Sequence, residues 1–170
     1  PFQTALRKAF NENHIPSFYH LSSNYDDIMD HIRHVGAMTG HDREAAALVQ
    51  KYNDILTEII QRHKDESAPR VLIVFGTPTS YQLASSKTYV GDIFQRLGAK
   101  NVADVYLPQD VSENALDGYI PLNLETMAVL DSNKVILINH GSSGKKDIAA
   151  LKKAFNTPAC QNVSAIANGN

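Results

Sequence analysis

The 170 residues are enough for one globular domain, and 43% of them are hydrophobic, so the chain can bury a substantial core. Sixteen Lys and Arg residues against eighteen Asp and Glu residues give a formal net charge of −2, which disfavours binding to nucleic acid or to an anionic membrane surface. The longest apolar runs, at 71–75 and 135–138, are far shorter than the roughly 20 residues that cross a bilayer. A single cysteine, Cys160, excludes an intramolecular disulfide and does not indicate a compartment.

The first part of the chain predicts two helices separated by an extended stretch. Apolar residues at helical spacing indicate a helix that ends at Asn13, and the extended pattern of residues 15–21 predicts a short strand after it. The second helix begins after a capping residue, Asn24, and ends near two glycines, Gly36 and Gly40.

A third helix is the longest expected element. From Asp42 to His63 one apolar face continues without interruption, which predicts a rod of about 22 residues and roughly 33 Å. Ile55 belongs to that face, so a charge there should destabilise the protein far more than a charge at Asn53. Charge, serine and proline at residues 64–69 end the helix.

The rest of the chain alternates strands and helices, which predicts an α/β fold with a parallel sheet. Residues 71–75 form a continuous apolar run closed by Gly76, as expected for a strand buried on both faces. A helix with Tyr89 and Leu97 on its apolar stripe then ends at Gly98. The remaining expected elements are a weak extended stretch at 102–107, a polar loop at 110–118, a helix at 123–130, a strand at 134–139, a helix at 145–155 and a strand at 163–166.

Two loops follow predicted strands, and ligands of open α/β sheets bind at this carboxyl end. One loop is the motif HGSSG at residues 140–144. The imidazole of His140 is a good ligand for iron or zinc, and the alternative is a hydrogen-bonded residue at the rim of the sheet. The other loop is GTPTSY at residues 76–81, in which Tyr81 either stacks on or ligates a bound group, or packs beneath the loop.

Familiar catalytic motifs are absent from the sequence. The GKK sequence at 144–146 lacks the first glycine and the Ser or Thr of a phosphate-binding loop. No G-x-S-x-G motif is present, and no nucleophile, base and acid can be assembled from spacing. The other histidines are spread over separate elements, and His31 and His34 lack the carboxylate of an H-E-x-x-H pair, so we interpret them as surface residues rather than zinc ligands.

Six motifs occur together in an order that is typical of one family. GTPTSY at 76–81, KTYVGDI at 87–93 and LGAKNV at 97–102 resemble the C-terminal lobe of substrate-binding proteins for iron-complex ABC importers. LNLE at 122–125 and AIANGN at 165–170 are similar to later segments of that family. VGAMTG at 35–40 resembles the segment that enters the long helix between its two lobes.

This resemblance implies how the chain is organised. Residues 1–41 correspond to the C-terminal part of the N-terminal lobe, residues 42–66 to the long inter-lobe helix, and residues 67–170 to a C-terminal lobe truncated at its end. The implied fold is α/β, with a three-layer, parallel-sheet lobe, the connecting helix and a partial N-terminal lobe. We therefore expect the chain, which starts at Pro1 without a Met, to be a piece of a longer bilobal protein.

The same resemblance implies the cargo and the residues that contact it. GTPTSY combined with a His-Gly pair after the later strand is most similar to the haem-binding branch of Gram-positive surface lipoproteins. In that branch the histidine is an axial iron ligand, so His140 is the implied haem ligand. Its partner there is a methionine of the N-terminal lobe, which none of the three methionines in this chain matches. If the cargo is instead a ferric siderophore, Tyr81 and Lys87 are the residues expected to face the anionic complex.

The resemblance implies that the protein is a non-catalytic transport receptor. Haem or a ferric siderophore is the transported ligand, and no catalytic cofactor is expected. Glu125, in the LNLE motif, is the implied docking residue for the ABC permease subunits, because the family carries an exposed acidic residue there that pairs with a permease arginine. The receptor is expected to be an extracytoplasmic monomer, either a cell-surface lipoprotein or periplasmic, with any lipid anchor on an N-terminal segment outside this chain.

Two alternatives belong to other classes of protein. A flavodoxin-like α/β enzyme or regulatory domain would use the loop at 140–144 on a phosphate or a cofactor. A transition-metal receptor would need several His, Asp or Glu ligands converging from both lobes, and the spacing does not provide them. A turnover screen identifies an enzyme, whereas a stoichiometric coloured complex without product indicates a receptor.

Overall fold

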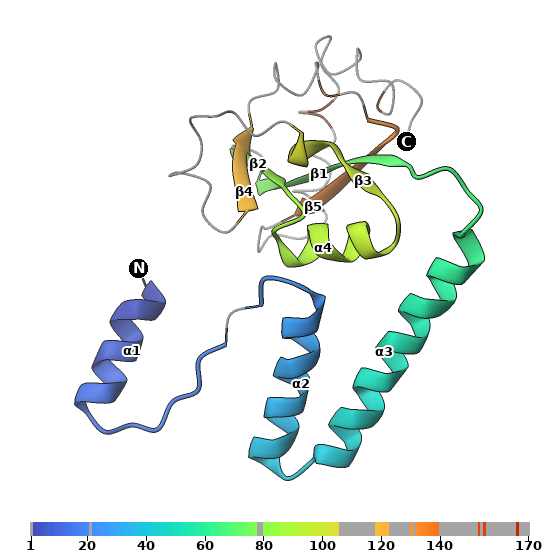
Figure 1. Ribbon diagram of the computed structural model, residues 1–170. Coiled ribbons are helices and arrows are strands. Elements are labelled where there is room, and N and C mark those ends of the chain that lie inside the picture. The colour runs from blue at the N-terminus through green and yellow to red at the C-terminus, as the bar shows by residue number, and fades with distance from the viewer. Residues whose placement is uncertain are drawn as a thin grey trace.

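The computed structural model describes residues 2–20, 22–77, 80–105, 118–122, 130, 132–139, 153, 155 and 166, with the backbone alone at residues 2–5, 77 and 139. Three helices, α1 (Phe2–Glu12), α2 (Tyr25–Thr39) and α3 (Asp42–His63), form the helical part, residues 2–63. The strands and α4 (Tyr89–Arg96) form the sheet part, which begins at residue 70. Figure 1 shows α2 and α3 side by side, with α4 between the sheet and the start of α2. No helix in these described segments is both long and apolar enough to cross a membrane.

The helical part confirms the local predictions. α3 spans the 22 residues from Asp42 to His63, as its apolar pattern predicts. The side chain of Asn24 accepts a hydrogen bond from the amide of Asp27 at 2.9 Å and so caps the start of α2. Gly40 ends α2 in the left-handed conformation with a φ of 72°, which glycine adopts without strain.

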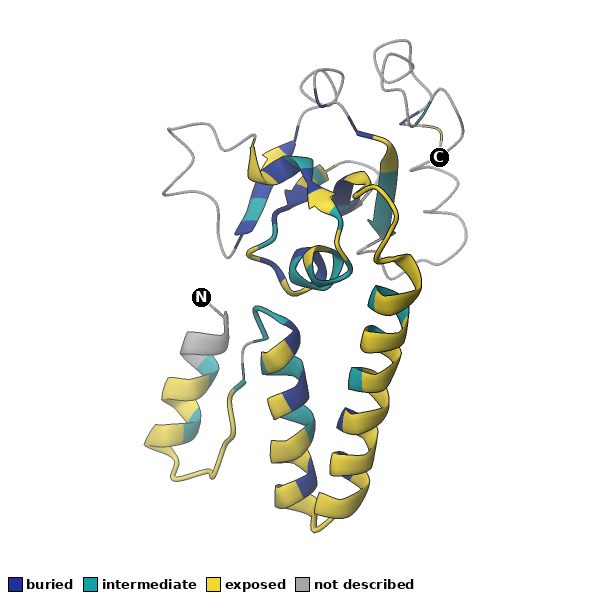
Figure 2. Ribbon diagram, turned by 45° about the vertical axis from the view of Figure 1, so that its right-hand side comes forward, coloured by how far each residue is buried: buried dark blue, intermediate teal, exposed yellow. Residues whose placement is uncertain are grey.

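The helices α2 and α3 pack closely against each other. A Cβ added at Gly36 of α2 would lie only 2.4 Å from the Cβ of Ala45 in α3, so this approach requires glycine. Tyr25 and Met29 of α2 and Val49 of α3 are buried in one cluster. Each helix therefore buries one face, while the outer faces stay exposed, as Figure 2 shows.

The expectation about the buried face of α3 is wrong. The side chain of Ile55 is 42% exposed, whereas Asn53 is half-buried. Asn53 accepts a hydrogen bond at 3.0 Å from the hydroxyl of Tyr25. The apolar stripe of α3 is wider than the surface that α2 covers, so Leu48 and Tyr52 also remain exposed.

The strand β1 (Arg70–Thr77) is the centre of the sheet. On one edge it pairs in parallel with β5 (Lys134–Asn139). On the other edge it pairs in parallel with β3 (Lys100–Asn101) at its start and antiparallel with β2 (Ser80–Ala84) at its end. β4 (Tyr119–Leu122) pairs antiparallel with β2 and lies at the outer edge of the described sheet.

Both faces of β1 are buried, which confirms the interpretation of its continuous apolar run. Leu72 and Val74 point to one face and Val71 and Ile73 to the other, where α4 packs. All four side chains are at most 2% exposed. The first cluster also contains Leu83, Ile120, Leu122 and Phe155, and the second contains Ala84, Val90 and Phe94.

The predicted α/β class is confirmed, but several strand assignments are corrected. The described sheet is mixed rather than parallel, because β1 continues to Thr77 and pairs antiparallel with β2 from Ser80, within the segment 76–81 that was expected as a loop. Residues 102–104 form a short 3-10 helix instead of an extended stretch, and Ile166 is helical where a strand was expected. Residues 15–20 form no strand. Strand formation depends on which segments pair, and that is decided by tertiary context rather than by local pattern. The expected elements at 110–117, 123–129 and 145–152 lie outside the described residues.

Candidate functional site

The carboxyl end of β1 brings three strands to one edge of the sheet. Gly76 lies opposite Asn139 of β5 on one side and opposite Tyr81 of β2 on the other. A Cβ at Gly76 would lie 2.5 Å from the carbonyl oxygen of Ser80, so β2 can fold back this closely only over a glycine. Ligands of open α/β sheets bind at such carboxyl edges. This edge is the candidate ligand site.

Tyr81 lies at the candidate edge, as the sequence predicts. Its half-buried ring meets the ring of Phe155 edge-on, with the centroids 5.2 Å apart. The ring also belongs to the core cluster on the first face of β1. The sequence left two alternatives for Tyr81, ligand contact or packing, and the structure contains the packing contacts. A contact of Tyr81 with a ligand stays a prediction.

Two predicted site residues, His140 and Glu125, lie outside the described residues. β5 ends at Asn139, which is in register with Gly76. The described strand therefore reaches the candidate edge one residue before His140. The role of His140 as an iron ligand and the role of Glu125 in docking both stay predictions.

Lys87 lies at the opposite end of β2 from Tyr81, in the turn that leads into α4. Its side chain is exposed, and its amide donates a hydrogen bond to Oγ of Ser85 at 3.3 Å. The same hydroxyl donates to the carbonyl oxygen of Gly118 at 2.8 Å, which holds the turn against the start of β4. The structure does not bring Lys87 to the edge where Tyr81 lies, so a shared ligand contact of the two stays a prediction.

A second tyrosine, Tyr119, has an altered acidity. It lies on β4 opposite Ala84, and its ring centroid is 5.3 Å from that of Phe75. Burial raises the pKa of Tyr119 above 10, and the neighbouring Tyr89 raises it further. In the absence of a ligand, Tyr119 is therefore a neutral hydroxyl at physiological pH.

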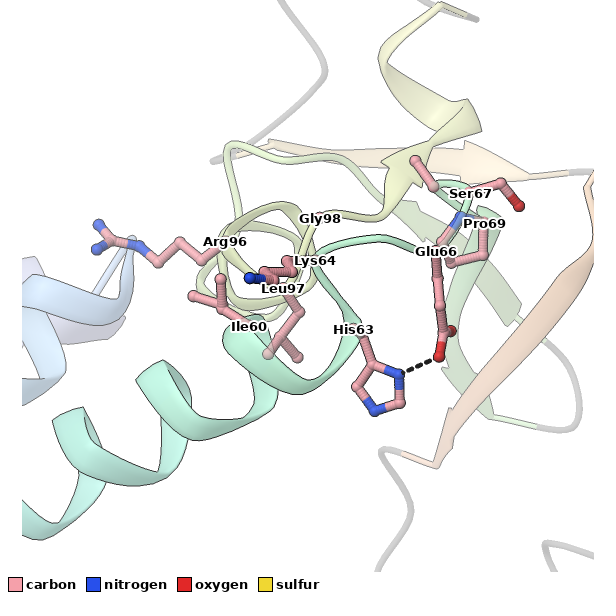
Figure 3. A pocket seen from close by; sticks show the side chains of 10 residues that line it. Ile60, His63, Lys64, Glu66, Ser67, Pro69, Arg96, Leu97 and Gly98 are labelled. Atoms are coloured by element: carbon pink, nitrogen blue, oxygen red, sulfur yellow. Dashed lines mark hydrogen bonds and ion pairs between the residues drawn. The ribbon is translucent and has the colours of Figure 1, made fainter.

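A hollow of about 430 Å³ lies between the ends of α3 and α4 (Figure 3). Ile60 and His63 line it from α3, together with Lys64 just after that helix and residues 66–69 and 96–98. His63 pairs with Glu66 through Nδ1 at 2.8 Å. The hollow adjoins the amino end of β1, which begins at residue 70, and so it is not at the edge where ligands of such sheets bind.

Three histidines that were expected on the surface lie close together. The ring centroids of His20 and His31 are 4.5 Å apart, and Phe18 stacks near both. The ring centroid of His34 lies 5.6 Å from that of Phe18 and 6.4 Å from that of His20. Nε2 of His20 and Nδ1 of His31 are buried and have no hydrogen-bond partner among the described residues. The part of the chain that the structure describes contains no group of three side chains placed to hold a metal ion.

The carboxyl ends of β1 and β5 meet at one edge of the described sheet, which is where α/β folds of this kind bind their ligands. The model of the family described as periplasmic binding protein matches residues 5–170, and the chain belongs to this family. The high-affinity heme uptake system protein IsdE of Staphylococcus aureus (strain MRSA252) is 30% identical over 121 residues, which cover 68% of this chain and 37% of IsdE.

Solved structures share the fold over almost the whole chain. S. aureus IsdE complexed with heme superimposes with a TM-score of 0.75 at 20% identity, covering 98% of this chain and 62% of that one. The siderophore-binding protein FeuA from Bacillus subtilis, complexed with Ferri-Bacillibactin, superimposes with a TM-score of 0.75 at 14% identity. The match covers 98% of this chain and 56% of that one. These likenesses confirm the resemblance that the motifs indicated. The chain spans 37% of the length of the curated relative. The ligand of that relative therefore does not by itself establish the ligand of this chain.

Proposed function

We propose that this chain is part of the substrate-binding component of an ABC importer that captures haem outside the cytoplasmic membrane and delivers it to the permease. The observation that carries the proposal is the 30% identity with the haem uptake protein IsdE over 121 residues. It lies within a family match that extends over residues 5–170. Residues 1–41 would then belong to the N-terminal lobe, residues 42–66 to the inter-lobe helix and residues 67–170 to the C-terminal lobe.

His140 is the residue that we propose as the axial iron ligand. It directly follows β5, which ends beside Gly76 at the candidate edge. A neutral imidazole is a strong axial donor to haem iron, and ligand sites in such folds are mostly apolar, which suits a porphyrin. Binding and release need no covalent step in the protein, so the role requires no catalytic group.

Absorption spectroscopy of the full-length protein tests this proposal. Titration with haem should give a one-to-one complex with a shifted Soret band. His140→Ala should change that spectrum and speed haem loss, because the iron loses an axial donor. His63→Ala is the matched control, since His63 lies at the far end of β1 and should leave both properties unchanged. A wild-type protein that binds no haem, or an unchanged spectrum in His140→Ala, contradicts the haem proposal.

A ferric siderophore is the second candidate cargo, and the fold shared with FeuA supports it. In this case Tyr81 and Lys87 would face the anionic complex. Tyr81→Phe removes the phenolic hydroxyl but keeps the ring that packs on Phe155, so it separates ligand contact from core packing. Weaker binding of a ferric siderophore in Tyr81→Phe and Lys87→Gln, with no haem complex in the wild type, would favour this cargo.

Delivery requires a permease, and Glu125 is the residue that we propose for docking. Glu125→Lys should abolish uptake by the reconstituted importer while cargo affinity stays intact. The alternative role is that of a carboxylate at a helix start, which is worth roughly 0.3–1 kcal/mol. Undiminished uptake by a folded Glu125→Lys protein would leave only this alternative. The receptor is proposed as an extracytoplasmic monomer, in the periplasm or attached to the cell surface.

A further inference from the structure

The helices α2 and α4 are joined by Tyr25, Asp26, Asp92 and Arg96, which together form the Arg96 network. Oδ2 of Asp92 accepts a hydrogen bond at 2.8 Å from the amide of Tyr25, which is 67 residues away in the sequence. The same oxygen accepts a hydrogen bond from Nε of Arg96 at 2.8 Å. The two terminal nitrogens of Arg96 donate to the two oxygens of Asp26 at 2.7 and 3.4 Å. One guanidinium thus connects a carboxylate of α4 with a carboxylate of α2.

Each member of the network has a specific physical task. The amide of Tyr25 is in the first turn of α2, where amides have no partner within the helix, and the carboxylate of Asp92 supplies one. The guanidinium of Arg96 lies 5.4 Å from the ring centroid of Tyr25. Hydrogen bonding to Asp26 raises the pKa of Arg96 above its ordinary value, so its charge is constant at physiological pH.

The network lies at the contact between the helical part and the sheet part. α2 of the helical part contacts α4 of the sheet part, and residues 64–69 link the two parts along the chain. Ile93 of α4 packs against the buried cluster of Tyr25, Met29 and Val49. Apolar contacts of this kind are not directional and tolerate sliding. Charge-assisted hydrogen bonds have a fixed geometry, and so the network is the element that defines the spacing.

We infer that Asp92 and Arg96 are positioning residues that set the spacing between the helical part and the sheet part, and through it the width of the cleft that holds the cargo. The effect on cargo rests on the proposed function, because a ligand held between the parts responds to their spacing. A planar guanidinium can bond two carboxylates in fixed directions, whereas a lysine ammonium is a point charge. Arg96→Lys therefore keeps the charge and loses the geometry.

The spacing can be measured in the full-length protein without any ligand. Spin labels at Ala47→Cys and Lys100→Cys, both at exposed positions, report the distance between the two parts, with Cys160→Ser in the background. Arg96→Ala and Arg96→Lys should both broaden the distance distribution relative to the unmodified network.

Arg33→Ala is the matched control for these variants. Arg33 also pairs with an aspartate, Asp30, at 2.7 Å, but both residues lie on α2. Its loss removes an exposed ion pair without affecting the contact between the parts. The distance distribution of Arg33→Ala should therefore match that of the parent protein.

Haem dissociation gives the second measurement. Arg96→Ala and Arg96→Lys should release haem about tenfold faster, because the arrangement that holds the cargo is less populated. An unchanged distance distribution in both variants would overturn the inference whatever the cargo. A broadened distribution with unchanged haem release would also overturn it, since spacing would then not affect the cleft. If the parent protein binds neither haem nor a ferric siderophore, the proposed function fails, and the distance measurement alone decides whether Arg96 sets the spacing.

Discussion

Gly36 should be intolerant of even one added methyl group. In an exposed helix Gly36→Ala would stabilise the protein by about 1 kcal/mol through helix propensity alone. In this protein the new Cβ would lie 2.4 Å from the Cβ of Ala45 and 3.1 Å from the carbonyl oxygen of His41. α2 and α3 would have to separate by about 1 Å to restore ordinary contact.

The expected loss follows from these opposing terms. Overpacking of this kind costs about 1–3 kcal/mol, and a contact between two groups fixed to backbones belongs near the upper value. After the gain in propensity, the net loss should be about 1–2 kcal/mol. One kcal/mol corresponds to about 2–4 °C in a protein of this size, so the Tm of Gly36→Ala should fall by roughly 2–8 °C.

A double-mutant cycle makes this prediction specific to the contact. Ala45→Gly alone should cost about 1 kcal/mol, because glycine is a poor helix former. The double variant Gly36→Ala/Ala45→Gly keeps one methyl group between the helices, so it should be nearly as stable as the parent. Urea denaturation should give a coupling energy of about 2 kcal/mol. Strictly additive losses would refute the packing argument.

Three further predictions concern buried hydrogen bonds and burial. Asn101→Ala should cost roughly 2–3 kcal/mol in chemical denaturation, because it leaves the buried carbonyl of Ala84, now bonded at 2.7 Å, without its partner. Asn53→Ala should cost about 1 kcal/mol, whereas Ile55→Lys should change stability by no more than about 0.5 kcal/mol, and the reverse order in thermal melts would contradict the observed burial. Burial raises the pKa of Tyr25, so its contribution is complete below the unfolded-state pKa of about 10 and is lost as the pH rises through the folded-state pKa; Tyr25→Phe should therefore flatten the decline in stability as the pH rises above about 10.

Local signals made the helices and the central strands predictable. The bounds of α3 follow from its apolar spacing, and the cap at Asn24 and the left-handed end at Gly40 are one-residue signals. β1 and β5 are short apolar runs, and Gly76 marks the edge where the candidate site lies. In each of these cases the residues that determine the local structure lie within a few positions of it in the sequence.

Features that depend on distant partners were not predictable. β4 contains Pro121, which argues against a central strand, but β4 lies at an outer edge where proline is tolerated. Asp92 and Arg96 have the spacing of an ordinary helix pair, and nothing in the sequence points to Asp26, 70 residues before Arg96. Ile55 was wrongly expected to be buried, because the sequence pattern shows that α3 has an apolar stripe but does not show how much of that stripe α2 covers.

The two halves of β1 have different neighbours, and this has a consequence for local unfolding. On one edge residues 71–76 pair in parallel with β5, while on the other edge the first residues pair with β3 and residues 74–77 pair with β2. β4 is held by β2 alone among the described strands, so its amides should exchange with deuterium first, those of β2 next and those of β1 last. β2 and β4 should thus open and close at the candidate edge while the start of β1 stays protected. The central strand β1 would then stay folded while the edge strands β2 and β4 open locally.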